Sequence, residues 1–281
     1  MTEFTAEFVE REYNNRAAVP DHPRWFDRYA ELSAAACAQY KPKLDLRYGP
    51  GPQETLDVFL PPGPARAMFV FIHGGYWRAL DKRDFSFVAA PFVEQGIAVA
   101  NVNYDLCPDV SIATIVGQCE RAVAWLVREA PAHGVNADRI VAGGHSAGGH
   151  LAAMLLATDW AAMGITSDPL AGAVSLSGVH DLVPLVLYSF NTDLKLDAAA
   201  AARMSPVNLT PRSRAPLVIA VGADETSEFL RQSRILWDRW PANRPAGMNA
   251  PLFIPERNHF SVVADYADPE SELTRATLAL F

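Results

Sequence analysis

The sequence predicts an α/β protein with a mostly parallel central sheet of about eight strands flanked by helices. Short apolar segments of strand length alternate along the chain with segments of helical pattern, which is typical of this class. Some of the apolar segments, such as Ala67–Ile72, lack polar alternation and indicate strands that are covered on both faces. A length of 281 residues with 50% hydrophobic and 20% charged residues is ordinary for one globular domain. We therefore assign residues 1–281 to a single domain.

The elements follow a regular order after an N-terminal extension, residues 1–40, in which one helix is predicted at Trp25–Tyr40. The predicted strands are Leu44–Tyr48, Thr55–Leu60, Ala67–Ile72, Ala98–Val102, Arg139–Ala142, Ala171–Leu176, Leu217–Val221 and Pro251–Ile254. The predicted helices are Phe85–Glu94, Ile112–Glu129, Gly149–Ala157, Glu228–Trp240 and Pro269–Leu280. Residues 179–216 break this alternation. We interpret them as short helices that form a lid over the strand ends, and a surface insertion without a role is the alternative.

Composition excludes several classes of partner. The net charge of −8 disfavours nucleic acid, because phosphate binding requires a basic surface. The longest apolar runs are shorter than the ~18 residues of a membrane span, and no signal peptide is predicted. The three cysteines show no metal-ligand spacing and suggest reduced thiols, hence a cytoplasmic protein. We expect a small-molecule substrate; the sequence leaves the oligomeric state open, with a homodimer as one possibility.

A glycine-rich run from Gly143 to His150 contains the pattern G-x-S-x-G, with Ser146 at its centre. It lies between a predicted strand and a predicted helix, the context in which this pattern exposes a nucleophilic serine on a sharp turn. A phosphate-binding loop is disfavoured, since the run fits neither G-x-G-x-x-G nor G-x-x-x-x-G-K-[ST]. The sequence therefore predicts Ser146 as a nucleophile.

A second motif, the run His73-Gly74-Gly75-Tyr76-Trp77, follows a buried strand. Hydrolases with a nucleophilic serine need N–H donors for the developing oxyanion. We expect those donors to be the backbone N–H groups of Gly74, Gly75 and Ala147, the last being the residue after the nucleophile. His73 is predicted to hold this loop by hydrogen bonds. Tyr76 and Trp77 are predicted to line the pocket, with core packing as the alternative.

An acid is expected after the strand Leu217–Val221, where Asp224 and Glu225 stand side by side. The chain order of serine, acid and histidine is the one that this architecture requires. Spacing alone leaves the two carboxylates as alternatives, and the one that is not catalytic is expected to be a solvated turn residue.

His259 is the one histidine that follows the candidate acid, and we predict it as the general base. His145 and His150 are predicted to be structural. Their spacing does not put both on one helix face, so a metal site is not expected there.

These motifs together resemble the kynurenine formamidase (arylformamidase) family, esterase-like and lipase-like members of the α/β-hydrolase superfamily. The resemblance includes Tyr13-Asn14-Asn15-Arg16, H-G-G-Y-W at 73–77, G-H-S-A-G-G-H at 144–150, Asp181-Leu182 with Pro184-Leu185, Ser205-Pro206, E-F-x-R-Q-S at 228–233 and Asn258-His259-Phe260. It favours Glu225 over Asp224, because the family carries its acid three residues before the E-F pair. Many relatives have Asp there, so the longer Glu side chain is a departure.

The resemblance implies a serine hydrolase with the α/β-hydrolase fold that converts N-formyl-L-kynurenine to kynurenine and formate through a formyl-serine intermediate. It implies Ser146, Glu225 and His259 as catalytic residues, with Tyr76, Trp77 and Tyr188 holding the aromatic group. This chemistry needs no metal and no organic cofactor. The alternatives are a carboxylesterase acting on small aryl or acyl esters, and a non-catalytic binding protein on a hydrolase fold. The sequence does not separate a role in tryptophan breakdown from detoxification of other formyl arylamines.

Overall fold

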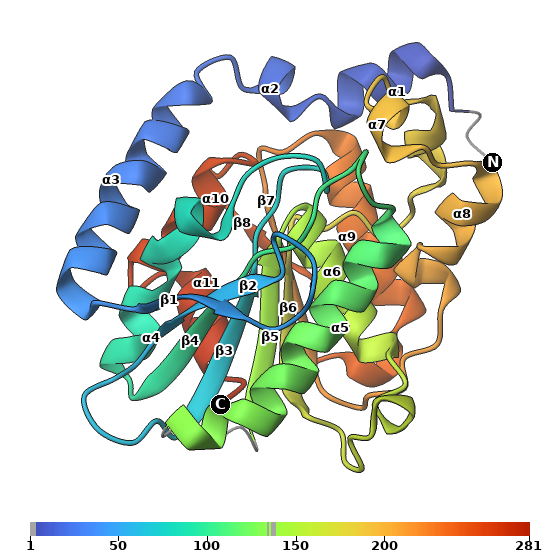
Figure 1. The fold of residues 1–281 in the computed structure, drawn as a ribbon. Coiled ribbons are helices and arrows are strands. Elements are labelled where there is room, and N and C mark those ends of the chain that lie inside the picture. The colour runs from blue at the N-terminus through green and yellow to red at the C-terminus, as the bar shows by residue number, and fades with distance from the viewer. Residues whose placement is uncertain (1–3, 134, 136–138) are drawn as a thin grey trace.

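A single eight-stranded sheet runs through the computed structural model, which describes residues 4–133, 135 and 139–281 (Figure 1). The strand order is β1-β2-β4-β3-β5-β6-β7-β8; the pairs β1–β2 and β2–β4 are antiparallel, and the neighbours from β4 through β3 to β8 pair parallel. The strands are β1 (Lys43–Arg47), β2 (Thr55–Phe59), β3 (Ala67–Ile72), β4 (Ile97–Val102), β5 (Ile140–His145), β6 (Leu170–Leu176), β7 (Leu217–Gly222) and β8 (Leu252–Ile254). The eight predicted strands are all present, and the fold is the predicted α/β class with a mostly parallel sheet.

Helices cover both faces of the sheet. The α-helices are α1 (Ala6–Tyr13), α2 (Asn15–Ala18), α3 (Pro23–Tyr40), α4 (Ala90–Glu94), α5 (Ile112–Glu129), α6 (Ala147–Ala157), α7 (Asn191–Leu194), α8 (Ala198–Arg203), α9 (Ser227–Arg239), α10 (Ser261–Ala264) and α11 (Glu272–Leu278). The 3₁₀ helices are η1 (Lys82–Ala89), η2 (Ala130–His133), η3 (Ala161–Met163), η4 (Val183–Leu187), η5 (Pro206–Asn208), η6 (Pro241–Asn243) and η7 (Asp265–Ala267). Within the described residues, no helix combines the length and the apolar character that crossing a membrane requires.

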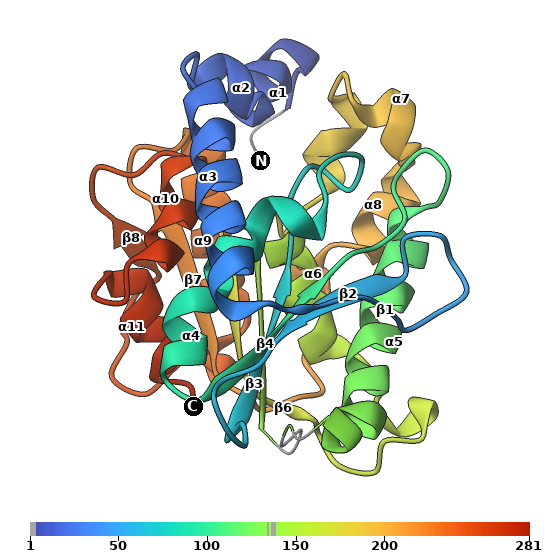
Figure 2. The same ribbon diagram turned by 60° about the vertical axis from the view of Figure 1, so that its left-hand side comes forward.

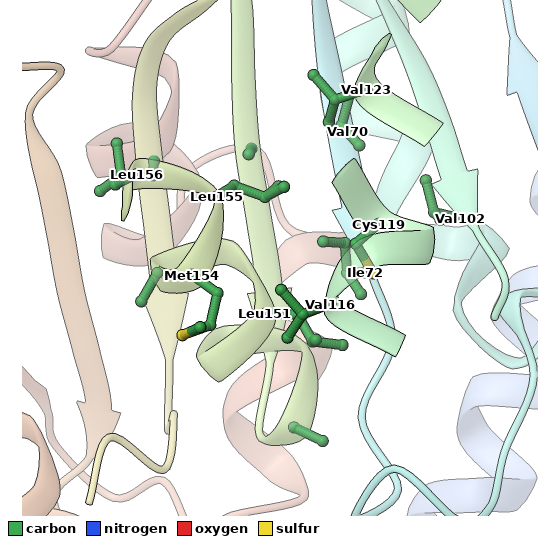
Figure 3. Packing of buried hydrophobic residues seen from close by; sticks show 14 of the residues in the cluster. Val70, Ile72, Val102, Val116, Cys119, Val123, Leu151, Met154, Leu155 and Leu156 are labelled. Carbon is green, nitrogen blue, oxygen red and sulfur yellow. The ribbon is translucent and has the colours of Figure 1, made fainter. Parts of the chain in front are cut away.

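The central strand β3 contributes to two hydrophobic cores, one on each face. Val70 and Ile72 pack with residues of α5 and α6, as Figure 3 shows for Cys119 and Leu151. Phe69 and Phe71 belong to the second core, with residues of η1, α4 and α11. Alternate side chains of one strand are thus buried on opposite faces, which is why this strand is apolar throughout.

Some element boundaries differ from the predicted ones. Strand β5 continues to His145, because Gly143 and Gly144 still pair with Val174 and Ser175 of β6. The C-terminal helix begins only at Glu272, where the Ser271 side chain caps it by accepting a hydrogen bond from Thr274 N–H.

The N-terminal extension contains two helices that the sequence pattern did not predict, α1 and α2. Thr5 caps α1 and Asn14 caps α2, each with its side-chain oxygen. Helix α1 contacts α9 and η4, while α3 packs along η1 (Figures 1 and 2). The extension therefore wraps around the end of the sheet where α7 also lies.

Candidate active site

Ser146 occupies the tight turn between β5 and α6. Its backbone has φ 58° and ψ −117°, a conformation that costs a non-glycine residue of order 1–3 kcal/mol. The turn is held by two backbone hydrogen bonds: Ser146 N–H donates to Leu176 O at 2.8 Å, and His150 N–H donates to Ser146 O at 3.1 Å. The strained turn lifts the serine out of both regular elements.

The glycines of the motif are required by close packing. A Cβ on Gly148 would lie 1.9 Å from Ile72 O, and one on Gly144 would lie 2.3 Å from Gly148 O. Neither contact can be relieved by moving a side chain, since the opposing atoms are backbone. The start of α6 therefore lies directly against the end of β3, where the second motif begins.

His259 is paired with Glu225. The Nδ1–H of His259 donates to Glu225 Oε2 at 2.7 Å, and both side chains are buried. The other carboxylate oxygen, Oε1, accepts from the Ser177 hydroxyl and from Gly222 N–H. The carboxylate fixes the histidine tautomer that has a free Nε2.

Asp224 takes no part in this arrangement. Its side chain is exposed, and its backbone N–H donates to Arg257 O at 3.0 Å. The structure thus brings Glu225, and not Asp224, to the histidine.

Ser146 and His259 line one pocket, with about 650 Å³ of space that includes its opening to solvent. Its other lining residues are Asn14, Asn15, Arg16, Phe26, Tyr29, Gly75, Tyr76, Arg78, Ala79, Leu80, Phe85, His145, Tyr188, Phe190 and Phe260. A concave, mainly apolar site with a few polar groups is typical of small-molecule binding. Within the described chain no hydrogen bond joins the Ser146 hydroxyl to His259. Such bonds are often long in free enzymes and shorten in the substrate complex.

The loop from Gly74 to Trp77 lies beside Ser146. A Cβ on Gly74 would be 3.1 Å from Ser146 Cβ, so this backbone approaches the serine closely. Gly75, Tyr76 and Trp77 have φ of 108°, 52° and 56°, three consecutive positive values. Tyr104 holds the start of the loop by donating its hydroxyl to His73 O at 2.9 Å. Ala147 is the first residue of α6, where backbone N–H groups have no partner inside the helix.

Besides His259, the described residues include four buried histidines, His73, His145, His150 and His180, of which His145 lines the pocket. His73 stacks on Tyr104 with ring centroids 4.3 Å apart, and its ring nitrogens lie 2.8 Å from Gly74 O and 2.9 Å from Asn103 Oδ1. His145 Nε2–H donates to His259 O at 2.9 Å, and His150 Nε2–H donates to Met204 O at 2.7 Å.

Burial lowers the pKa of each of these histidines, since it disfavours the charged imidazolium. The pKa falls well below the usual range for His145, to about 4 for His150 and to about 3 for His180. The neutral rings make structural contacts, as expected for His73, His145 and His150. No group of three or more potential metal ligands occurs among the described residues.

The three predicted aromatic residues differ in position. Tyr76 and Tyr188 line the pocket with ring centroids 5.4 Å apart, and both donate their hydroxyls to Tyr13 O. Trp77 is fully buried in the core and packs edge-on against His150 at 5.0 Å. The prediction that Trp77 lines the pocket is wrong, because successive residues of this irregular loop direct their side chains to different surroundings.

Several residues near the site were not predicted. Ser177 follows β6 and binds Glu225, and Asn15, Arg16 and Arg78 line the pocket. The position of Ser177 at the carboxyl end of a strand is a signal that could have identified it. Asn15 and Arg16 belong to the Tyr13–Arg16 motif of the family resemblance. No periodicity connects this motif with the pocket, because it reaches the pocket from the N-terminal extension.

Comparisons with known proteins identify relatives of this chain. The BD-FAE family model matches residues 56–240. Kynurenine formamidase from Salmo salar is 32% identical over 84% of this chain and 81% of its own length, and the Danio rerio protein of that name is 31% identical over the same shares.

Solved structures give the same fold. A structure from silicibacter sp. tm1040, described as a "putative thioesterase", superposes with a TM-score of 0.86 at 34% identity and covers 96% of this chain and 98% of its own. Esterase B from Lactobacillus rhamnosis, at 19% identity and a TM-score of 0.66 over 95% of this chain and 96% of its own, supports the fold alone. The chain is a hydrolase of amide or ester bonds and belongs to the kynurenine formamidase family of the α/β-hydrolase superfamily.

Proposed function

We propose that this protein is a serine hydrolase that deformylates an aryl formamide, N-formyl-L-kynurenine, to kynurenine and formate. The observation that carries the proposal is the shared pocket of Ser146 and His259, whose wall is largely aromatic. The relatives named kynurenine formamidase support the choice of substrate.

In the proposed first half-reaction, Ser146 Oγ attacks the formyl carbon while His259 Nε2 takes the hydroxyl proton. The tetrahedral intermediate collapses when the bond from carbon to nitrogen breaks, and His259 returns the proton to the aniline nitrogen. Glu225 supports this role because its hydrogen bond holds Nδ1–H and stabilises the imidazolium. Kynurenine leaves, and the formyl group remains on the serine.

In the second half-reaction a water molecule gives its proton to His259 and attacks the formyl carbon. The bond to Ser146 Oγ breaks, the serine recovers its proton and formate leaves. In both halves the backbone N–H groups of Gly74, Gly75 and Ala147 would stabilise the oxyanion. The close approach of Gly74 to Ser146 supports this part of the proposal. One such donor is worth about 3–4 kcal/mol in the transition state.

Aromatic side chains would hold the leaving group. Tyr76, Tyr188 and Phe190 pack against one another with ring centroids 4.8 to 5.8 Å apart and form part of the pocket wall. Stacking of the kynurenine ring on this wall would favour aryl formamides over aliphatic ones. We further propose a cytoplasmic location, which the three free cysteines support, and a role in tryptophan breakdown, which rests on the proposed substrate.

The alternative is a carboxylesterase that uses the same residues. It is favoured by the 34% identity to the silicibacter protein, whose description names a thioesterase. Specificity constants for N-formyl-L-kynurenine and for a series of p-nitrophenyl esters rank the two functions. A specificity constant for the esters that exceeds the one for the formamide would make carboxylesterase the better assignment.

The direct test uses purified wild-type protein and the Ser146→Ala variant with N-formyl-L-kynurenine, followed by kynurenine absorbance. We expect kcat to fall by about 10⁴- to 10⁶-fold in the variant. Ser233→Ala is the matched control, since that hydroxyl is buried in α9 and donates only within its own helix to Phe229 O. Equal rates for wild type and Ser146→Ala would refute the proposal. Failure of a fluorophosphonate probe to label Ser146 would instead support a non-catalytic protein.

A further inference from the structure

One part of the pocket wall is polar and comes from the N-terminal extension. Asn14, Asn15 and Arg16 line the pocket there, whereas the aromatic residues named above form much of the remaining wall. Ser146 directly follows β5 and His259 lies in the loop after β8, so both are far from the N-terminal extension in the sequence. The pocket is therefore closed by a segment that takes no part in the proposed bond-breaking steps.

Asn15 has an unsatisfied side chain. The residue is 5% exposed, it lines the pocket, and its Nδ2 is buried without a hydrogen-bond partner. An amide donor that is buried and unpaired carries a desolvation cost, because it has lost its hydrogen bonds to water. A ligand in the pocket that accepts a hydrogen bond would remove this cost.

Arg16 is a cation without a carboxylate partner among the described residues. Its guanidinium lies 5.9 Å from the Phe26 ring centroid, and no ion pair includes it. Arg78, the other arginine of the pocket, is paired with Asp193 at 2.6 Å. Among the described residues no acidic side chain lines the pocket; Glu225 binds His259, and Glu10 accepts a hydrogen bond from Asn14. The free positive charge of the pocket therefore lies at Arg16.

We propose that Asn15 and Arg16 form a subsite for a carboxylate on the leaving group of the substrate. This inference rests on the proposed function and names the part of the substrate that the polar wall recognises. Both side chains donate hydrogen bonds, and a carboxylate only accepts them. The planar guanidinium fork matches a carboxylate in geometry as well as in charge. In N-formyl-L-kynurenine this group is the α-carboxylate, at the opposite end of the molecule from the formyl group.

The subsite is held in place before substrate binds. The carbonyl oxygen of Tyr13, two residues before Asn15, accepts the hydroxyls of both Tyr76 and Tyr188. Asn14 caps α2 by accepting from Ala17 N–H at 3.1 Å, and its Nδ2 donates to Glu10 at 2.9 Å. These bonds fix the polar wall relative to the aromatic wall. The backbone of the subsite therefore needs little reordering when a ligand binds, whereas the exposed Arg16 side chain is ordered by the ligand itself.

The test compares two substrates that differ in the carboxylate alone: N-formyl-L-kynurenine and its decarboxylated analogue N-formylkynuramine. We expect Arg16→Gln to lower kcat/KM for the first substrate by about 10- to 100-fold, mainly through KM, because a charged hydrogen bond is lost. The same variant is expected to turn over the second substrate at least as well as wild type, since a repelling positive charge is removed. Arg16→Lys should recover part of the activity, and Asn15→Leu should show the same selectivity as Arg16→Gln with a smaller effect.

Arg28→Gln is the matched control, because Arg28 is exposed on α3 and pairs only with Glu31. It should leave both substrates unchanged. Equal losses on both substrates in Arg16→Gln, or no loss on either, would overturn the subsite.

Binding measurements separate this inference from the proposed function. In the Ser146→Ala background, calorimetry should give a Kd for N-formyl-L-kynurenine that rises about 10-fold or more with Arg16→Gln. If the wild type hydrolyses neither formamide, the proposed function fails. In that case a Kd that rises with Arg16→Gln still supports the subsite. A Kd that Arg16→Gln leaves unchanged refutes it.

Discussion

Glu225 Oε2 lies 2.7 Å from His259 Nδ1, while its second oxygen accepts hydrogen bonds from Ser177 and Gly222. Three donors that the fold places there thus bind this carboxylate. The turn itself is closed by Glu225 N–H, which donates to Gly222 O at 3.2 Å. The side chain is therefore aimed at the histidine by its own backbone turn and by two further donors.

Glu225→Gln should lower kcat by about 10⁴-fold, because an amide can donate to the ring and so favours the wrong tautomer of His259. Asp224→Asn removes the neighbouring carboxylate at an exposed position and should keep kcat within about twofold. Steady-state kinetics on N-formyl-L-kynurenine measures both. A strong loss in Asp224→Asn together with an active Glu225→Gln would contradict the assignment.

Gly148→Ala should cost both stability and activity. Its Cβ would lie 1.9 Å from Ile72 O, so the start of α6 must move away from β3, and overpacking of this kind costs about 1–3 kcal/mol or more. Displacing the serine by about 1 Å is worth about 10²-fold in rate. The control is Gly117→Ala in α5, where the nearest atom is the flexible end of Arg121 at 3.8 Å. There alanine should stabilise the helix by about 0.5–1 kcal/mol and leave kcat unchanged. Urea unfolding and kinetics of both variants decide the point.

Stability should decrease as the pH falls below about 6.5. Burial lowers the pKa of His150 to about 4 and of His180 to about 3, whereas both titrate near 6.5 in the unfolded chain. Between pH 6.5 and about 4 the unfolded state binds the extra protons. The free energy of unfolding therefore falls by about 1.4 kcal/mol per pH unit for each of the two rings, and it does not change from this cause above pH 6.5.

Urea unfolding at pH 7.5, 6.5, 5.5 and 5.0 measures this slope. His180→Gln should lose stability at pH 7.5 but show a shallower slope than wild type. Ile115→Val, a buried substitution without titratable groups, should lower stability by about 0.5–1.5 kcal/mol at every pH and keep the wild-type slope. Identical slopes in wild type and His180→Gln would rule out this origin of the acid sensitivity.

Tyr13→Phe should loosen the N-terminal extension. The buried hydroxyl donates to Glu228 at 2.8 Å and accepts from Gln232 at 2.7 Å, so its loss leaves a buried carboxylate and amide short of partners. We expect a decrease of about 1–3 kcal/mol in the free energy of unfolding and a higher KM for N-formyl-L-kynurenine. Tyr40→Phe removes the corresponding tyrosine–glutamate bond at a solvent-exposed site, to Glu94 at 2.7 Å. That control should stay within about 0.5 kcal/mol of wild type.

The central strands could be predicted from the sequence because they are buried on both faces and therefore mostly apolar, as in β3. Helices α1 and α2 could not. They are short, and short helices depend on packing rather than on intrinsic propensity. The buried side of α1 is defined by Val9 and Tyr13, and the hydrogen-bond partner of Tyr13 on α9, Glu228, lies 215 residues away in the chain.

The geometry of the site divides in the same way. Ser146 and His259 could be predicted, since a strand-to-helix turn and a chain order specify them. The choice between Asp224 and Glu225 depends on which way a three-residue turn directs its carboxylates, and spacing does not encode that direction. The prediction for Trp77 was wrong for a related reason. Gly75, Tyr76 and Trp77 have three successive positive φ values and belong to no regular element, so no periodicity indicates where their side chains lie. Arg16 reaches the pocket through tertiary folding alone.

Different segments of the chain supply the catalytic residues and the proposed recognition residues of the pocket, and this affects how substrate selectivity can change. The BD-FAE match spans residues 56–240, which include Ser146 and Glu225 but neither His259 nor the N-terminal extension with Arg16. That extension contacts the remainder of the pocket through the Tyr13 carbonyl and through the packing of Phe26 on Phe260 and of Tyr29 on Phe85. The subsite proposed for the leaving group therefore lies on a segment that is separate in sequence from Ser146, Glu225 and His259, and the two parts can diverge at different rates. Exchange of the first 40 residues between relatives offers a route to new leaving groups without redesign of the sheet.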